Sequence, residues 1–193
     1  MTFVLASASP RRVDLLHAAG FTFDVAPVDI DEARLPAERP DDYVQRVAWA
    51  KADAAAARRP GTVVLAADTA VIVGDHAPVP PEILGKPADA ADAARMLRML
   101  AGRAHEVLTG VAITDGRRRI GFVDVTRVWF EALSRDDIEA YVATGEPMGK
   151  AGAYAIQGRA SRFVPRIEGA YANVVGLPVA RVSEALRTFG IAR

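Results

Sequence analysis

The chain has 193 residues, which is long enough to bury a sizeable core, and we expect residues 1–193 to form a single domain with two lobes. Lysine plus arginine and aspartate plus glutamate both number 24, so the balanced charge argues against a protein held to nucleic acid or to an anionic membrane surface. Cysteine is absent, which excludes disulfides, thiolate metal sites and a cysteine nucleophile.

The first part of the chain predicts a strand, a tight loop and a helix. Residues 3–6 are apolar and bounded by serine, which is typical of a short buried strand. In the next segment Ser9 can be the N-cap, Pro10 stands at the favoured first helical position, and Gly20 supplies the stop. Further elements predicted in this half are a strand at 22–26, a helix at 41–59 and a helix at 89–100.

Two apolar segments, 62–67 and 69–74, flank Asp68 and predict two strands that are neighbours in one sheet. Several prolines between residues 75 and 87 then predict a surface loop without regular structure. Residues 105–133 are rich in β-formers around Asp115-Gly116, which favours a hairpin with a type I′ turn.

Towards the C-terminus, Ser134 followed by Asp137 favours a capped helix that ends at Gly145. The last predicted elements are one or two short strands between Ala151 and Ile167 and a helix from Pro178 to Gly190. This order of strands and helices is that of a mixed α/β protein.

The string SASPRR is the first candidate for chemistry. A strand that leads through a loop into a helix presents unpaired backbone N–H groups and the positive end of the helix dipole. Ser7 and Ser9 add hydroxyl groups, and Arg11 and Arg12 add guanidinium groups that point about 100° apart along a helix. This chemistry suits a triphosphate; the alternative is a capped helix with two solvated arginines.

Asp68-Thr69 is the second candidate, because ligands of open α/β sheets tend to lie beyond the carboxyl ends of strands. A carboxylate there can bind a metal ion or activate water, and the alternative is a turn residue. Glu32 could add a second metal ligand, and three lysines could neutralise phosphate charge, although each of these side chains could equally be solvated. These lysines are Lys51, Lys86 and Lys150.

The glycine-rich strings AGAYAIQG and EGAYANVVGLP form another candidate. Their glycines permit a close approach of the backbone, and the amide of Gln157 can read the edge of a base. The alternative is turn chemistry with a solvated glutamine. The sequence lacks the motifs of four other protein classes: P-loop (GxxxxGK[ST]), Rossmann (GxGxxG), zincin (HExxH) and serine hydrolase (GxSxG).

In their order and spacing these strings resemble the Maf family of nucleoside triphosphate pyrophosphatases. The resemblance covers nearly the whole chain, through SASPRR, Glu32, VAWAKA, ADTAVIVG, GKP, MLRMLAGRAHEVLTGV, GKAGAYAIQG and IEGAYANVVGLP. It implies an α/β fold in which a mixed twisted sheet with flanking helices forms two lobes around a cleft, as in inosine triphosphate pyrophosphatases. It also implies a homodimer.

The resemblance assigns roles to individual residues. Asp68 falls on the family's proton acceptor, and Ser7, Arg12, Glu32, Lys51 and Lys86 fall on its phosphate- and metal-facing positions. Because the triphosphate carries several negative charges, we expect Mg²⁺ or Mn²⁺ as cofactor, with Glu32 and Asp68 as ligands. Gly149 stands where the family commonly has an aspartate, and the stretch between Asp68 and Lys86 is longer than is usual.

Base preference is implied by Arg11, Thr69 and Gln157, which match the subgroup that prefers dTTP and UTP rather than 7-methyl-GTP. We therefore expect hydrolysis of dTTP and UTP to the monophosphate and pyrophosphate. The alternatives are a house-cleaning enzyme for modified pyrimidine nucleotides and a nucleotide-binding regulator of septum formation with little turnover.

Beyond the nucleotide and a second copy of the chain, no partner is expected. No apolar run approaches the roughly 18 to 20 residues needed to cross a bilayer, and MTFVLASASPRR does not resemble a signal peptide. We therefore expect a cytoplasmic protein that binds neither membrane nor nucleic acid.

Overall fold

The computed structural model describes residues 2–74 and 81–192. The chain divides into two compact units. Unit 1 contains Met1–Thr69, Thr109–Asp124 and Gly176–Arg193, and unit 2 contains Ala70–Leu108 and Val125–Val175. The single domain expected for residues 1–193 stays a prediction. Among the described residues, no helix is both long and apolar enough to cross a membrane.

The strands form a seven-stranded sheet in the order β2-β1-β3-β5-β6-β7, with β4 paired to β3. The strands are β1 (Phe3–Leu5), β2 (Phe23–Val25), β3 (Val64–Val73), β4 (Glu82–Leu84), β5 (Ala104–Thr114), β6 (Arg119–Trp129) and β7 (Arg166–Glu168). The pairs β1–β2 and β1–β3 are parallel, whereas β3–β4 and β6–β7 are antiparallel. This mixed sheet, with helices against it, confirms the predicted fold class.

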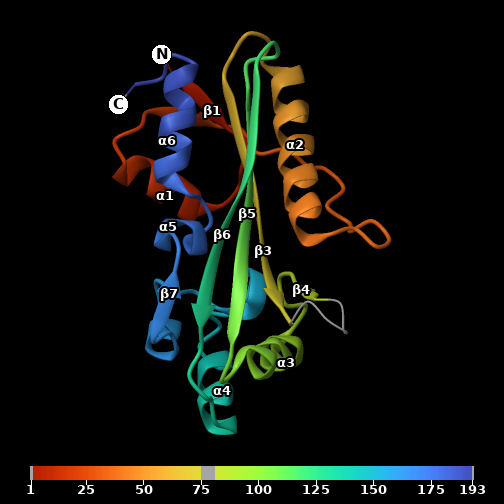
Figure 1. Ribbon diagram of the computed structural model, residues 1–193, viewed down its shortest axis with the longest axis vertical. Coiled ribbons are helices and arrows are strands. Elements are labelled where there is room, and N and C mark those ends of the chain that lie inside the picture. The colour runs from red at the N-terminus through yellow and green to blue at the C-terminus, as the bar shows by residue number, and fades with distance from the viewer. Residues whose placement is uncertain (1, 75–80, 193) are drawn as a thin grey trace. The chain divides into compact units, whose positions relative to one another are not determined.

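Unit 1 has helices on both faces of its strands. Figure 1 shows α2 (Pro40–Arg58) on one side and α1 (Pro10–Ala18) with α6 (Val179–Thr188) on the other. Successive side chains of a strand point to opposite faces. Odd-numbered residues such as Leu5 and Leu65 therefore pack in the cluster that contains side chains of α1 and α6, and even-numbered residues such as Ala66 pack against the alanines of α2.

Small residues let α2 lie close to the sheet. Its buried alanines are Ala48, Ala52 and Ala55, and each has little side chain to hold the helix away. A side chain at Gly110 of β5 would overlap the backbone of α2 at Val44. The glycine is therefore required by the close approach of helix and strand.

Unit 2 has an aromatic core. Burial lowers the pKa of His105 to about 3, so its ring is neutral, and Nε2 lies 2.9 Å from the hydroxyl oxygen of Tyr154. Phe130 packs edge-on against both rings. The helical elements of this unit are α3 (Ala90–Leu100), α4 (Arg135–Val142), the 3-10 helices η1 (Ala151–Ala153) and η2 (Arg159–Phe163), and α5 (Tyr171–Val175).

Several predicted elements are confirmed. Ser9 is the N-cap of α1 with Pro10 in its first turn, although the Ser9 side chain makes no capping hydrogen bond. Ser134 and Asp137 form the predicted capping box of α4. The predicted helices at 41–59, at 89–100 and from Pro178 correspond to α2, α3 and α6, and the predicted hairpin to β5 and β6.

Two predictions around Asp68 are wrong. Residues 64–73 form one continuous strand rather than two neighbouring strands, so Asp68 lies in the middle of β3 and not at a strand end. Neither Asp68 nor Thr69 is a glycine or proline that would break the strand. The predicted loop at 75–87 contains β4, whose buried Leu84 pairs with Val71 of β3; residues 75–80 lie outside the described part of the chain.

The turn at Asp115-Gly116 and the strands before Ile167 also differ from the predictions. A type I′ turn needs positive φ at both central residues, but only Gly116 of the Asp115-Gly116 pair has it. The Asp115 carboxylate instead accepts hydrogen bonds from the backbone N–H groups of Arg117 and Arg118, which favours a longer loop. Of the one or two short strands expected between Ala151 and Ile167, only β7 begins in that range, at Arg166. The 3-10 helices η1 and η2 precede it, and the left-handed backbones of Gly152 and Ala153 exclude a strand at η1.

Candidate active site

Three charged side chains of unit 1 converge. Lys51 Nζ lies 2.7 Å from Oδ1 of Asp68 and 2.8 Å from Oε1 of Glu32. The side chains of Lys51 and Asp68 are each 11% exposed, whereas that of Glu32 is 47% exposed. A buried lysine thus holds one buried and one accessible carboxylate, and removing one member of such a buried pair typically costs about 3–5 kcal/mol.

Strand and helix periodicity bring these groups together. Asp68 has an even number in β3, so its side chain lies on the face that α2 covers. Lys51 lies in the buried stripe of α2, together with Val44, Val47, Ala48, Ala52 and Ala55. Because the other members of that stripe are apolar, Lys51 finds its charged partners outside the helix, in Asp68 of β3 and in Glu32 of the segment before α2.

Each of these carboxylates keeps one oxygen that its ion pair with Lys51 does not use. Among the described residues, Oδ2 of Asp68 and Oε2 of Glu32 accept no hydrogen bond. In the same part of the chain, no group of three or more histidine, cysteine, aspartate or glutamate side chains converges. The centre therefore offers two carboxylates, one fixed and one accessible, beside one ammonium group.

Arg12 forms a second network on the opposite face of β3. Its Nε donates to the carbonyl of Gly176 at 2.8 Å, and Nη2 donates to the hydroxyl of Thr69 at 3.0 Å. Nη1 donates to Oγ of Ser7 at 3.1 Å and to the carbonyl of Ala67 at 2.7 Å. Four of the five N–H groups of this buried guanidinium are thus used within unit 1. Burial lowers the pKa of Arg12, and the nearby Asp68 opposes that shift.

Thr69 is held from several sides, because its hydroxyl also lies 2.9 Å from that of Thr109. Gly176 has a φ of 131°, which favours glycine, and it places its carbonyl on Arg12. Ser7 also belongs to the Arg12 network. Its Oγ accepts from the backbone N–H of Ser9 at 3.2 Å. Arg11 is partly buried, and its Nε has no hydrogen-bond partner among the described residues.

The other predicted site residues belong to unit 2. Lys86 and Gln157 are exposed, and neither side chain makes a hydrogen bond or ion pair with the described residues. Lys150 donates to the backbone carbonyls of Glu146 and Met148. The structure thus brings six predicted residues into two networks of unit 1, and it leaves Lys86 and Gln157 free of side-chain partners.

Sequence reasoning missed Tyr43 of α2, which lies two helical turns before Lys51. Burial, followed by the negative charges of Asp68 and Glu32, raises the pKa of Tyr43 to about 12. The signal was available, because residues four and eight apart lie on one side of a helix. This spacing places Tyr43 beside Lys51 but does not by itself show that Asp68 lies near both.

Sequence reasoning also missed the pair Glu38–Arg46, which supports the loop between β2 and α2 that carries Glu32. Arg46 Nε donates to Oε1 of Glu38 at 2.6 Å, and Arg46 Nη2 donates to the carbonyl of Ala33 at 3.0 Å. Oε2 of Glu38 accepts from the backbone N–H of Leu35 at 3.0 Å. This hydrogen bonding to Arg46 is the main cause that lowers the pKa of Glu38 to about 2.

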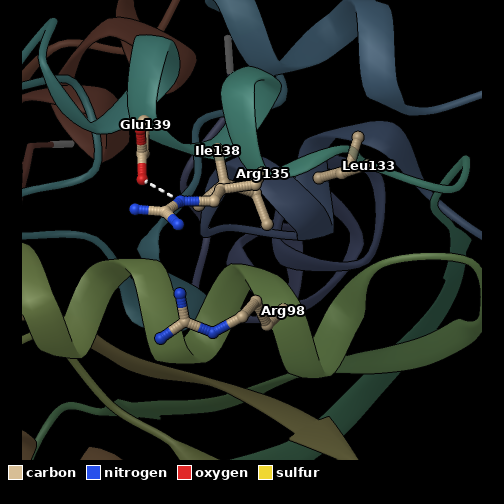
Figure 2. A pocket seen from close by; sticks show the side chains of 5 residues that line it. All are labelled: Arg98, Leu133, Arg135, Ile138 and Glu139. Carbon is tan, nitrogen blue, oxygen red and sulfur yellow. Dashed lines mark hydrogen bonds and ion pairs between the residues drawn. The ribbon is translucent and has the colours of Figure 1, made fainter.

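A pocket of unit 2 contains none of these residues. Figure 2 shows Arg98 of α3 facing α4, where Arg135 and Glu139 form an ion pair at 2.6 Å. Leu133 and Ile138 complete its lining. No predicted site residue lines this pocket, and an exposed ion pair of this kind is worth little energetically.

Comparisons with known proteins cover nearly the whole chain. The family described as Maf-like protein matches residues 2–189. A dTTP/UTP pyrophosphatase of Geobacter sp. (strain M21) is 52% identical over 191 residues, which are 98% of this chain and 96% of that protein. A dTTP/UTP pyrophosphatase of Geobacter metallireducens is 54% identical over 190 residues, with coverage of 97% and 95%. A solved HAM1 protein from Coxiella burnetii aligns over 100% of both chains with a TM-score of 0.56 and 16% identity, a likeness of fold alone.

Proposed function

The chain belongs to the family of Maf-like proteins, and we propose that it hydrolyses nucleoside triphosphates, with dTTP and UTP preferred, to the monophosphate and pyrophosphate. The observation that carries the proposal is the centre in which Lys51 holds Asp68 and Glu32. The names of the two Geobacter relatives support the substrate class.

Asp68 is the proposed proton acceptor. Lys51 fixes its Oδ1 and leaves Oδ2 for a water molecule. The water oxygen attacks the α-phosphorus as its proton passes to Asp68. The bond from the α-phosphorus to the oxygen that bridges to the β-phosphorus breaks, and pyrophosphate leaves with the electron pair. General-base action of this kind typically contributes about 10²- to 10⁴-fold to the rate.

A divalent cation fits this donor set. Glu32 and Asp68 offer carboxylate oxygens, and Mg²⁺ is usually bound by one or two carboxylates together with substrate phosphates. We assign Glu32 and Asp68 as the residues that would hold Mg²⁺ or Mn²⁺. When bound, the ion supplies positive charge where negative charge develops on the phosphates.

The start of α1 is the proposed phosphate-binding element. Its N-terminus carries the positive end of a helix dipole, and Ser7, Ser9 and Arg11 lie beside it. Arg12 keeps one N–H group beyond its internal hydrogen bonds and contributes its charge there. The role of Lys86 as a catalytic cation rests on the resemblance alone.

Base selection is assigned to Arg11, Thr69 and Gln157. One amide can accept from the N3–H of uracil or thymine and donate to a neighbouring carbonyl. Cytosine reverses that pattern, and a buried unpaired group typically costs about 1–3 kcal/mol. The exposed, unpartnered amide of Gln157 supports this role, because it is available to a ligand.

A panel of nucleotides and metals tests the proposal by measuring pyrophosphate release. We expect dTTP and UTP to be good substrates with Mg²⁺ or Mn²⁺, and CTP and 7-methyl-GTP to be at least about tenfold worse in kcat/KM. A preference for 7-methyl-GTP would overturn the base assignment. Tight binding without turnover would favour a regulator of septum formation instead.

We further propose a homodimer in the cytoplasm, where nucleoside triphosphates are available. The family resemblance supports the dimer. Light scattering coupled to size exclusion tests it, and a mass of 20.6 kDa for the particle would contradict it.

A further inference from the structure

The turn that carries Gln157, residues 155–160, is held at both ends through its backbone N–H groups. The N–H of Ala155 donates to the hydroxyl oxygen of Tyr141 at 3.2 Å. Inside the turn, the N–H of Gly158 donates to the carbonyl of Ala155 at 3.0 Å. The Gln157 side chain has no partner among the described residues, so this backbone alone fixes the position from which the side chain extends.

Glu146 holds the far end of the turn. Its Oε2 accepts from the N–H of Arg159 at 3.1 Å, and Oε1 accepts from the N–H of Ala160 at 3.4 Å. The hydroxyl of Tyr141 donates to the same Oε1 at 2.8 Å. A single carboxylate therefore joins both ends of the turn, one directly and one through Tyr141.

The pair Tyr141–Glu146 is itself fixed. The Tyr141 ring is buried and packs edge-on against Phe163. Glu146 follows α4 at a turn in which the Thr144 hydroxyl accepts from its backbone N–H at 3.1 Å. A side chain at Gly158 would overlap the Glu146 carboxylate, so turn and carboxylate are in close contact.

We propose that Glu146, through the backbone of residues 155–160 and with Tyr141, is a positioning residue that orients Gln157 and thereby sets discrimination between bases. This inference rests on the proposed role of Gln157. A fixed turn presents the amide at one place beside the base, so groups of the wrong base stay unpaired, whereas a turn that can move lets the amide adjust to either base. Support of the turn therefore decides selectivity rather than the rate of bond cleavage.

The test compares kcat/KM for UTP and CTP in the wild type and three variants. Glu146→Gln removes the charge that both N–H groups use, Tyr141→Phe removes the hydroxyl but keeps the ring on Phe163, and Gly158→Ala pushes against the carboxylate. We expect each variant to lose most of the UTP:CTP preference of about tenfold, with little change in kcat on saturating UTP.

Gln157→Ala shows how much of the UTP:CTP preference depends on the amide itself. The double variant Glu146→Gln/Gln157→Ala should lose no more of that preference than Gln157→Ala alone, because the effects of coupled residues are not additive. Glu139→Gln is the matched control: its carboxylate pairs with Arg135 on exposed α4 and does not contact the turn. We expect that control to keep the wild-type preference.

Each result bears on the inference. If Glu146 were merely structural, Glu146→Gln would lower the melting temperature and would lower the activity on all nucleotides alike. An unchanged UTP:CTP ratio in folded Tyr141→Phe and Gly158→Ala would overturn this inference but not the proposed function. A wild type that hydrolyses neither dTTP nor UTP refutes the proposed function. A wild type that hydrolyses UTP and CTP equally refutes the role of Gln157, and the inference with it.

Discussion

The charged centre of unit 1 and the Gln157 turn of unit 2 are built in opposite ways. In the centre, Lys51 pairs with both Asp68 and Glu32, so the reactive groups are also the supporting groups. In the turn, Gln157 bonds to nothing described, and Tyr141 and Glu146 hold only its backbone. Substitutions in the centre should therefore change chemistry and stability together, whereas in the turn selectivity can be separated from both.

The largest expected effect is that of Asp68→Asn. This change removes the proton acceptor and weakens the metal site, so kcat should fall by at least about 10²-fold. Lys51 keeps only the more exposed Glu32 as a charged partner, so the melting temperature should fall as well. Asp53→Asn, which breaks an exposed pair with Arg119, is the control and should keep near-normal kcat. Near-normal turnover of Asp68→Asn would refute its catalytic role.

Arg12→Ala is expected to combine both kinds of effect. It leaves the buried carbonyls of Ala67 and Gly176 without their donor, so the melting temperature should fall. It also removes charge beside the phosphates, which should lower kcat/KM by about 1.5–3 kcal/mol. Because phosphates carry no information about the base, the loss should be equal for dTTP, UTP and CTP, and a loss confined to one nucleotide would contradict the assignment.

Glu38→Gln tests whether the comparison holds inside unit 1, where Glu38 and Arg46 support the loop that carries Glu32. We expect a higher Mg²⁺ concentration for half-maximal activity and an unchanged kcat at saturating Mg²⁺, because the loop is loosened but the ligand remains. A lower kcat at saturating Mg²⁺ would show that Glu38 does more than support the loop.

The pair Glu38–Arg46 should also affect the stability of the wild type in acid. The pKa of Glu38 is lowered from its ordinary 4.5 to about 2, so its contribution is present above about pH 4.5 and is lost as the pH falls towards 2. Between those values the wild type should lose stability more steeply with falling pH than Glu38→Gln, in unfolding by urea at a series of pH values. Parallel curves would contradict the contribution.

The smallest effect is expected at Tyr43, and it appears only in alkali. Its pKa is raised to about 12, so the folded state keeps the proton after the unfolded chain has lost it near pH 10. Stability from this group is complete below pH 10 and is lost as the pH rises through 12. Tyr43→Phe should therefore lose less stability than the wild type over that range, and an ultraviolet titration should lose one high-pKa tyrosine.

Local patterns predicted the elements whose signals lie within a few residues. The capping box at Ser134, the proline at the start of α1 and the helix at 89–100 needed only neighbours in sequence, and all are confirmed. The break predicted at Asp68 failed because a polar residue inside an apolar run looks like the end of a strand. Only the partners across the sheet, and Lys51 from α2, make a buried carboxylate acceptable at that point.

The sequence by itself determined the mixed α/β class and, through ordered strings such as SASPRR and GKAGAYAIQG, the family and the identities of the candidate site residues. Tertiary structure decided which of these side chains bond to one another. Asp68 and Thr69 are neighbours in the chain, yet β-strand alternation sends one to Lys51 and the other to Arg12. Such assignments depend on contacts between segments 17 to 164 residues apart, which no local pattern contains.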